Sequence, residues 1–162
     1  MGKLGVLGIG NTLKGDDGIG PVLVNRLKEK GIPDDVEVHE VGTSGMNILH
    51  YLKDLDSAVI VDALRSEGEP GDSIFFSPDD VEEDIEVRST HDANLLEAIE
   101  LSATIGERPE EIVIMGIIPE DISIRDELSE SLQDRLPELE EKLREEILSL
   151  LEGESNSGQR DK

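Results

Sequence analysis

The chain has 162 residues, of which 39 are acidic and 15 are Lys or Arg, so its formal net charge is −24 at pH 7. A charge of this sign repels phosphate backbones and anionic lipid headgroups, which argues against nucleic acid and membrane surfaces as partners. The acidity fits basic peptides or metal ions as partners, and equally a high-salt cytoplasm. The chain has no Cys, which excludes disulfides, thiolate metal sites and Cys nucleophiles.

No stretch reaches the roughly 18 apolar residues of a transmembrane helix, and the N-terminus lacks the layout of a secretion signal. We therefore expect a soluble cytoplasmic protein. Aromatic residues make up only 2% of the chain, so the core must be built from Ile, Leu, Val and Ala. No exposed apolar run stands out, which favours a monomer.

The apolar pattern predicts alternating strands and helices. The first half is expected to contain a strand at 4–7, a helix at 21–30 ended by Gly31, a strand at 36–41, a helix at 46–52 and a buried strand at 59–61. The second half is expected to contain a strand at 73–76, a helix at 92–104, a strand at 112–118 and a charged helix at 128–151 that Pro137 breaks or kinks.

This order indicates an α/β fold: a three-layer sandwich with a mostly parallel, mixed five-stranded sheet and flanking helices. The strand at 73–76 follows a connection too short for a crossover helix, so we expect it to be antiparallel and at an edge. Residues 1–152 are expected to form one domain and 153–162 a disordered tail. The acid-rich segment Asp79–Glu86 is interpreted as a solvated loop rather than a binding patch.

Three metal-ligand types are expected at one edge of the sheet. Asp17 follows the first strand, Asp62 ends the apolar run Ala58–Val61, and His91 precedes a helix. The carboxyl ends of the strands in an open α/β sheet form the usual ligand crevice. Two carboxylates and an imidazole there would suit a divalent transition metal.

Each of these residues also has an ordinary structural explanation. Asp62 could be a turn or capping residue, and His91 a surface or capping histidine. Asp92 could cap the next helix or orient the His91 imidazole. His39 and His50 have no acidic motif beside them and are not assigned to a site. The chain shows no serine in a nucleophile-elbow setting and no His-Glu-x-x-His pair.

The loop Gly8-x-Gly10 offers an alternative, because it follows a strand as in dinucleotide-binding folds, and Glu40 ends the next predicted strand. Two features oppose this. Leu13 stands at the third glycine position, and Asp16 and Asp17 stand where a pyrophosphate would bind. The glycines could instead serve only to permit positive φ in a tight loop.

Together these stretches resemble the hydrogenase maturation endopeptidases, the nickel-dependent proteases that trim the large subunit of nickel-iron hydrogenases. The resemblance covers roughly residues 4–150. The matching stretches are Gly8–Asn11, Asp16–Gly20, Gly42–Gly45, Val61–Ala63, Ser89–Asp92 and Gly116–Glu120.

The resemblance implies an enzyme that removes the C-terminal extension of the large-subunit precursor after nickel insertion. It implies that Asp17, Asp62 and His91 bind a nickel ion supplied by that precursor, and that the metal serves as a recognition check. Asp16 could assist as a base or merely hold the loop, and we favour the loop-holding role. A non-catalytic metal-binding assembly factor on the same fold, and a dinucleotide-binding oxidoreductase, remain as alternative hypotheses.

Overall fold

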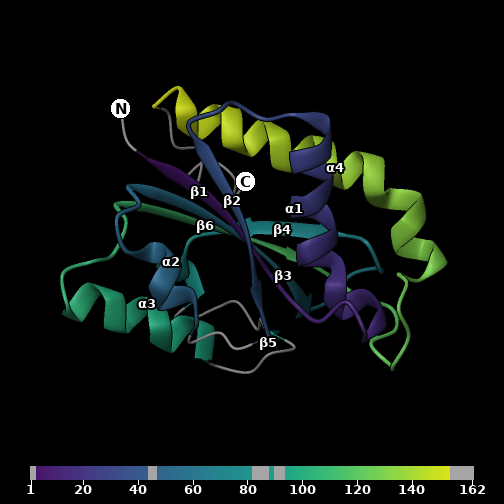
Figure 1. The fold of residues 1–162 in the computed structure, drawn as a ribbon. Helices are drawn as coiled ribbons and strands as arrows, with labels where there is room; N and C mark the ends of the chain where they lie inside the picture. The colour runs from purple at the N-terminus through teal and green to yellow at the C-terminus, as the bar shows by residue number, and fades with distance from the viewer. Residues whose placement is uncertain (1–2, 44–46, 82–87, 90–93, 154–162) are drawn as a thin grey trace.

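The computed structural model describes residues 3–43, 47–81, 88–89 and 94–153, and its centre is a mixed sheet (Figure 1). The strand order is β2-β1-β3-β6-β4. The bounds are β1 Leu4–Ile9, β2 Val36–Gly42, β3 Ser57–Arg65, β4 Ser73–Phe76 and β6 Glu111–Ile117. Strands β2, β1, β3 and β6 pair in parallel, and β4 pairs antiparallel with β6. The α/β fold and the antiparallel edge strand at 73–76 are therefore confirmed.

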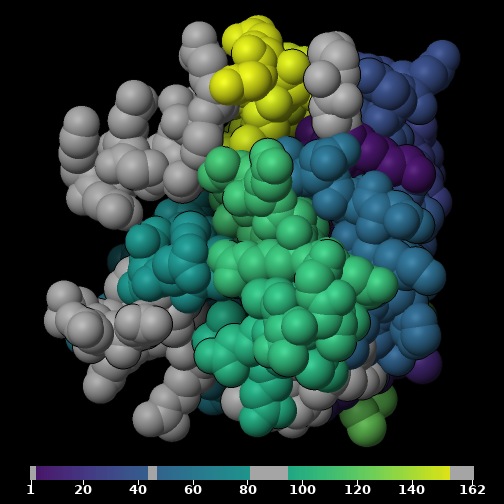
Figure 2. Space-filling model, turned by 90° about the vertical axis from the view of Figure 1, so that its left-hand side faces the viewer, coloured from purple at the N-terminus to yellow at the C-terminus, as the bar shows by residue number. Residues whose placement is uncertain are grey.

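Helices cover both faces of the sheet, which makes the three layers. Helices α1 (Ile19–Lys30) and α4 (Glu130–Leu151) pack together on one face, and α2 (Ile48–Leu52) and α3 (Asn94–Thr104) on the other (Figure 1). Figure 2 looks at the side from which β1 starts, where α3 fills the centre of the view. The carboxyl ends of the parallel strands therefore lie on the side away from that viewer.

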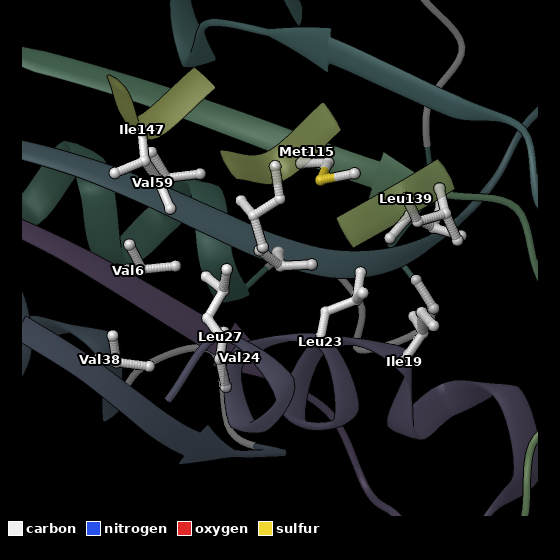
Figure 3. Close-up of a cluster of buried hydrophobic side chains, with 14 of the residues drawn as sticks. Val6, Ile19, Leu23, Val24, Leu27, Val38, Val59, Met115, Leu139 and Ile147 are labelled. Atoms are coloured by element: carbon white, nitrogen blue, oxygen red, sulfur yellow. The ribbon is translucent and has the colours of Figure 1, made fainter. Parts of the chain in front are cut away.

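Each face of the sheet has its own aliphatic core. Figure 3 shows Leu23, Val24 and Leu27 of α1 directed at Val6 and Val59 of the sheet. Leu139 and Ile147 of α4 close the same cluster. Residues on the alternate positions of the strands, such as Leu7 and Ile60, pack against α2 and α3 instead. This alternation is what a sheet covered on both sides requires. Ile, Leu, Val and Ala make up both clusters as expected, with Phe76 and Met115 as the exceptions.

Three details differ from the sequence-based expectations. Strand β3 runs to Arg65, four residues beyond the predicted end, because β6 and a short extra strand continue to pair with it. That extra strand is β5 (Arg88–Ser89), which lies antiparallel to the end of β3 and was not predicted. Helix α4 runs through Pro137 without a break, so a break there was wrong.

Other expectations concern segments only partly described. Asp79 and Asp80 lie in the short 3-10 helix η3 (Pro78–Val81), but residues 82–87 of the acid-rich segment lie outside the described residues. So do residues 154–162 of the expected tail. None of the helices in the described ranges is both long and apolar enough to cross a membrane.

A buried carboxylate joins the two helices of the α1–α4 layer. Glu140 of α4 has a side chain only 6% exposed, and its Oε1 lies 2.9 Å from Arg26 Nε and 3.2 Å from Lys30 Nζ of α1. Burial by itself would raise the pKa of Glu140, but the hydrogen bonds from Arg26 and Lys30 outweigh it, so the pKa is lowered. The ionised form is therefore the one that holds the helices together.

We expect Glu140→Gln to lower the free energy of unfolding at pH 7 by about 2 kcal/mol, because it removes charge-assisted hydrogen bonds and leaves Arg26, Lys30 and Arg144 without their ion-pair partner. A depressed pKa stabilises the fold above the unfolded-state value and loses that contribution as pH falls through the folded-state value. The difference from wild type, measured by urea unfolding, should therefore shrink below about pH 4.5. Glu141→Gln, at the exposed neighbouring position, is the control and should show no such difference.

Candidate active site at the carboxyl edge of the sheet

The loop after β1 packs tightly against the sheet, and glycines make this possible. A Cβ on Gly10, whose φ is +154°, would lie 2.0 Å from the carbonyl oxygen of Asp17. A Cβ on Gly20 would lie 2.5 Å from the carbonyl oxygen of Val61 in β3. The backbone of the loop, of the 3-10 helix η1 (Gly15–Gly18) and of the first turn of α1 is thus pressed onto the ends of β1 and β3. A close approach to the strand ends therefore explains two of the glycines.

Asp17 lies in η1 and is only 3% exposed. Its Oδ2 accepts a hydrogen bond of 3.1 Å from the backbone N–H of Asn11, which closes the loop on itself. Asp17 also makes further interactions, so it is not an unpaired charge. Two adjacent buried carboxylates, Asp16 and Asp17, occupy the loop in which a dinucleotide fold would hold its pyrophosphate, and they disfavour an anionic ligand there.

Asp62 lies inside β3 rather than at its end, and it is fully buried. The expectation that it follows the strand was wrong, because the pairing of Asp62 with Gly116 continues the ladder with β6. The ladder between β1 and β3 ends at Gly8 and Val61, one residue earlier. Asp62 therefore flanks the point where β1 gives way to the loop of Asp17, and η1 contacts β3 there.

The local hydrogen bonding of Asp62 does not match the capping explanation. Its Oδ1 accepts a hydrogen bond of 2.8 Å from the backbone N–H of Ala63, the next residue in the same strand, and no helix begins there. It too makes further interactions. The structure thus brings two buried carboxylates, Asp17 and Asp62, to the carboxyl edge of neighbouring strands, and such hard oxygen donors fit a divalent metal.

The third predicted ligand, His91, and its neighbour Asp92 lie outside the described residues. Within the ranges that are described, no group of three or more His, Asp or Glu side chains could hold a metal. His39 and His50 lie in β2 and α2, as predicted. Contrary to expectation, His39 has an acidic neighbour: its Nε2 lies 3.1 Å from Glu37 Oε1.

Asp16, next to Asp17, is fully buried and accepts four hydrogen bonds. Its Oδ2 accepts from the backbone N–H groups of Glu120 (2.8 Å) and Asp121 (3.1 Å) and from the Ser129 hydroxyl (2.8 Å). Its Oδ1 accepts from the backbone N–H of Ser129 at 2.7 Å. Donors on every side are what a loop-holding role requires, and they tie the loop after β1 to the segment between β6 and α4.

Backbone hydrogen bonds strengthen this connection. The backbone N–H of Gly15 donates to the carbonyl oxygen of Arg125 (2.9 Å), and that of Asp16 donates to the carbonyl oxygen of Asp121 (2.8 Å). The backbone N–H of Arg125 donates to the carbonyl oxygen of Leu13 (3.0 Å). Hydrogen bonds from the side chain and backbone of Ser123, with the guanidinium of Arg125, hold the pKa of the Asp121 carboxyl below its usual range. The two loops therefore form one polar unit beside Asp17.

Ser129 is a site residue that our sequence analysis did not identify. It is the N-cap of α4, accepting a hydrogen bond from the backbone N–H of Leu132 at 3.4 Å, while its hydroxyl donates to Asp16. A serine directly before a Leu-rich amphipathic helix is a recognisable N-cap signal. The cap was thus visible in the sequence, but its partner 113 residues away was not.

Two concave regions border this unit. The larger, of about 710 Å³, lies at the start of α4 and includes Glu120, Asp121, Arg125 and Ser129 in its lining. The smaller, of about 220 Å³, lies at the end of β3 and after β6. Its lining residues are Arg65, Ser66, Ile118, Pro119, Glu120 and Ile122. Both lie on the carboxyl side of the sheet.

Known proteins share this sequence pattern and this fold. A family model described as hydrogenase maturation protease matches residues 21–146. The hydrogenase 2 maturation protease of Escherichia coli K12 is 32% identical over 120 residues, which are 72% of this chain and 73% of that protein.

Solved structures agree with this. The hydrogenase maturating endopeptidase HybD from E. coli matches with a TM-score of 0.76 and 29% identity, covering 93% of both chains. The nickel-iron hydrogenase maturation protease HybD from Thermococcus kodakarensis matches with a TM-score of 0.73 and 28% identity, covering 88% of this chain and 97% of that one. The chain therefore belongs to the hydrogenase maturation protease family.

Proposed function

We propose that this chain is an endopeptidase that removes the C-terminal extension from the nickel-loaded large-subunit precursor of a nickel-iron hydrogenase. The observation that carries the proposal is the pair of buried carboxylates, Asp17 and Asp62, at the carboxyl edge of β1 and β3 in a chain of this protease family. Buried charges are costly to maintain, so their presence at a ligand-binding edge favours a functional role.

Nickel would arrive as part of the substrate. Asp17, Asp62 and His91 would hold it there with two oxygen donors and one nitrogen, a set that leaves positions for the precursor's own ligands. When bound, the metal would supply recognition of a loaded precursor and polarisation of a nearby carbonyl. The loop that Asp16 holds would fix the position of Asp17 relative to β3.

We infer that water is the attacking group. The chain has no Cys and no serine in a nucleophile-elbow setting, so its sequence offers neither of these two usual nucleophiles for an acyl intermediate. In this hydrolysis the water oxygen bonds to the scissile carbonyl carbon, the C–N bond breaks, and the proton passes to the leaving amine.

The test is to incubate the protein with the cognate nickel-loaded precursor and to measure the large-subunit mass. We expect one product, shorter by the C-terminal extension, and no product from the nickel-free precursor. An unchanged mass with the cognate precursor would contradict the proposal. Stable capture of the precursor without loss of mass would instead support the assembly-factor hypothesis.

A further inference from the structure

Arg65 is the last residue of β3, three positions after Asp62 on the same strand. It is exposed, and it lines the smaller pocket, of about 220 Å³, together with the apolar residues Ile118, Pro119 and Ile122. The carboxylate in this lining is Glu120, whose backbone N–H donates to Asp16. The pocket is therefore built on the segment that Asp16 holds beside Asp17.

The alternation of side chains along β3 places Arg65 relative to the rest of the site. Val59, Val61 and Ala63 belong to the core between the sheet and helices α1 and α4. Arg65 follows Ala63 by two positions, so its side chain projects toward the same face of the sheet, and that of Asp62 projects toward the other face. Three residues of β3 span about 10 Å, so a peptide whose scissile bond is held at the end of β3 near Asp62 would reach Arg65 within a few residues.

Among the arginines whose side chains the structure describes, Arg65 differs in having no carboxylate partner within the described ranges. The other five form ion pairs; they are Arg26, Arg108, Arg125, Arg135 and Arg144. Across the described ranges, no ion pair or side-chain hydrogen bond is made by Arg65.

A guanidinium that has no carboxylate partner among the described residues is unexpected in a chain with 39 acidic residues. The planar fork of a guanidinium matches a carboxylate, with which it forms two parallel hydrogen bonds. The surrounding Ile118, Pro119 and Ile122 would contact apolar atoms of the same segment. This combination fits one acidic side chain of a peptide, with its methylene groups on the apolar wall.

We propose that Arg65 determines substrate specificity by binding the carboxylate of an Asp or Glu side chain of the precursor, within about five residues of the scissile bond. The proposal rests on the proposed endopeptidase function and adds the chemistry of one substrate position. It assigns Arg65 to substrate binding and gives it no part in the chemical step.

The first test compares the kinetics of precursor cleavage by wild type, Arg65→Gln and Lys53→Gln. Lys53 is also exposed and makes no ion pair in the described part of the chain. It lies between α2 and the start of β3, away from the carboxyl ends of the strands. Both variants change the net charge equally. We expect Arg65→Gln to raise KM about tenfold with kcat within about twofold, and Lys53→Gln to leave both unchanged.

Salt dependence gives a second readout. The KM of wild type should rise with ionic strength, and the KM of Arg65→Gln should rise less, because the screened interaction is already lost. A charge exchange then locates the substrate residue. Each acidic residue near the scissile bond is changed singly to Lys, and Arg65→Glu should restore cleavage of one of these precursors.

Different results would overturn the assignment of Arg65 and the proposed endopeptidase function. If wild type cleaves the precursor and Arg65→Gln has an unchanged KM, the assignment of Arg65 is wrong and the endopeptidase function stands. Equal increases of KM in Arg65→Gln and Lys53→Gln would also overturn it, since they would show a general charge effect. Absence of cleavage by wild type would overturn both proposals.

Discussion

Asp62→Asn is expected to reduce precursor processing by at least about a hundredfold, because it removes an anionic oxygen donor from the site proposed to meet nickel. Asp17→Asn should do the same. The change replaces one oxygen by an NH2 group of similar size, so the geometry of the loop and the strand is retained. Processing is measured as the rate of mass loss of the nickel-loaded large subunit.

The same variants should remain folded. For Asp62 the reason is not a position at the end of a strand, where a side chain would contribute little to the core, because Asp62 lies within β3 and is fully buried. Holding a carboxylate there opposes folding through desolvation, and a neutral amide reduces that penalty. We therefore expect melting temperatures within a few degrees of wild type or above it, measured by calorimetry. Gross unfolding of Asp62→Asn would instead show that the carboxylate braces the strand.

His91→Ala is the third variant of this set and should also abolish processing. Two matched controls separate the site from general effects. Asp56→Asn changes an exposed carboxylate at the other end of β3, and its role as acceptor for the backbone N–H of Lys3 (2.7 Å) can be kept by the amide oxygen. His50→Ala removes an exposed histidine of α2. Both controls should process the precursor normally, and full processing by His91→Ala would disprove the metal-site assignment.

Much of the fold could be predicted because continuous apolar runs mark strands buried on both faces. The edge strand β4 followed from a single argument, the shortness of the Glu69–Asp72 turn, and its antiparallel pairing with β6 confirmed it. The true length of β3 could not be predicted in this way. Asp62 and Arg65 interrupt its apolar pattern, and only pairing with β6 and β5 keeps that segment extended.

The site was predictable in part for a similar reason. Asp16 and Asp17 are neighbours with the same side chain, so composition and spacing cannot separate their roles. What distinguishes the role of Asp16 from that of Asp17 is Ser129, 113 residues later in the chain, which donates to Asp16 from its backbone N–H and its hydroxyl. Long-range hydrogen bonds of this kind leave no periodic signal. The expected placement of His91 beside Asp62 stays a prediction, since residues 90–93 lie outside the described part of the chain.

The hydrogen bonds of Asp16 predict a graded loss of stability rather than a selective loss of chemistry. Asp16→Ala leaves four donors without their acceptor and should lower the free energy of unfolding by about 3 kcal/mol. For a chain of this size that corresponds to a fall of roughly 10 °C in melting temperature. Asp16→Asn should have a smaller effect, because the amide keeps one oxygen as an acceptor and its NH2 group faces donors at the other oxygen position only. Ser129→Ala should cost about 1 kcal/mol through the lost cap and one lost hydrogen bond.

Processing activity should decline in the same order as stability, since the loop that carries Asp17 is held by these contacts. The exposed Asp126, in the same segment, provides the control, and Asp126→Asn should match wild type in both measurements. A catalytic base at position 16 would give a different result: Asp16→Asn would be inactive yet as stable as wild type, and Ser129→Ala would be nearly fully active. Melting temperatures and processing rates of the four variants, measured side by side, therefore decide between a residue that holds the loop and a residue that takes part in the reaction.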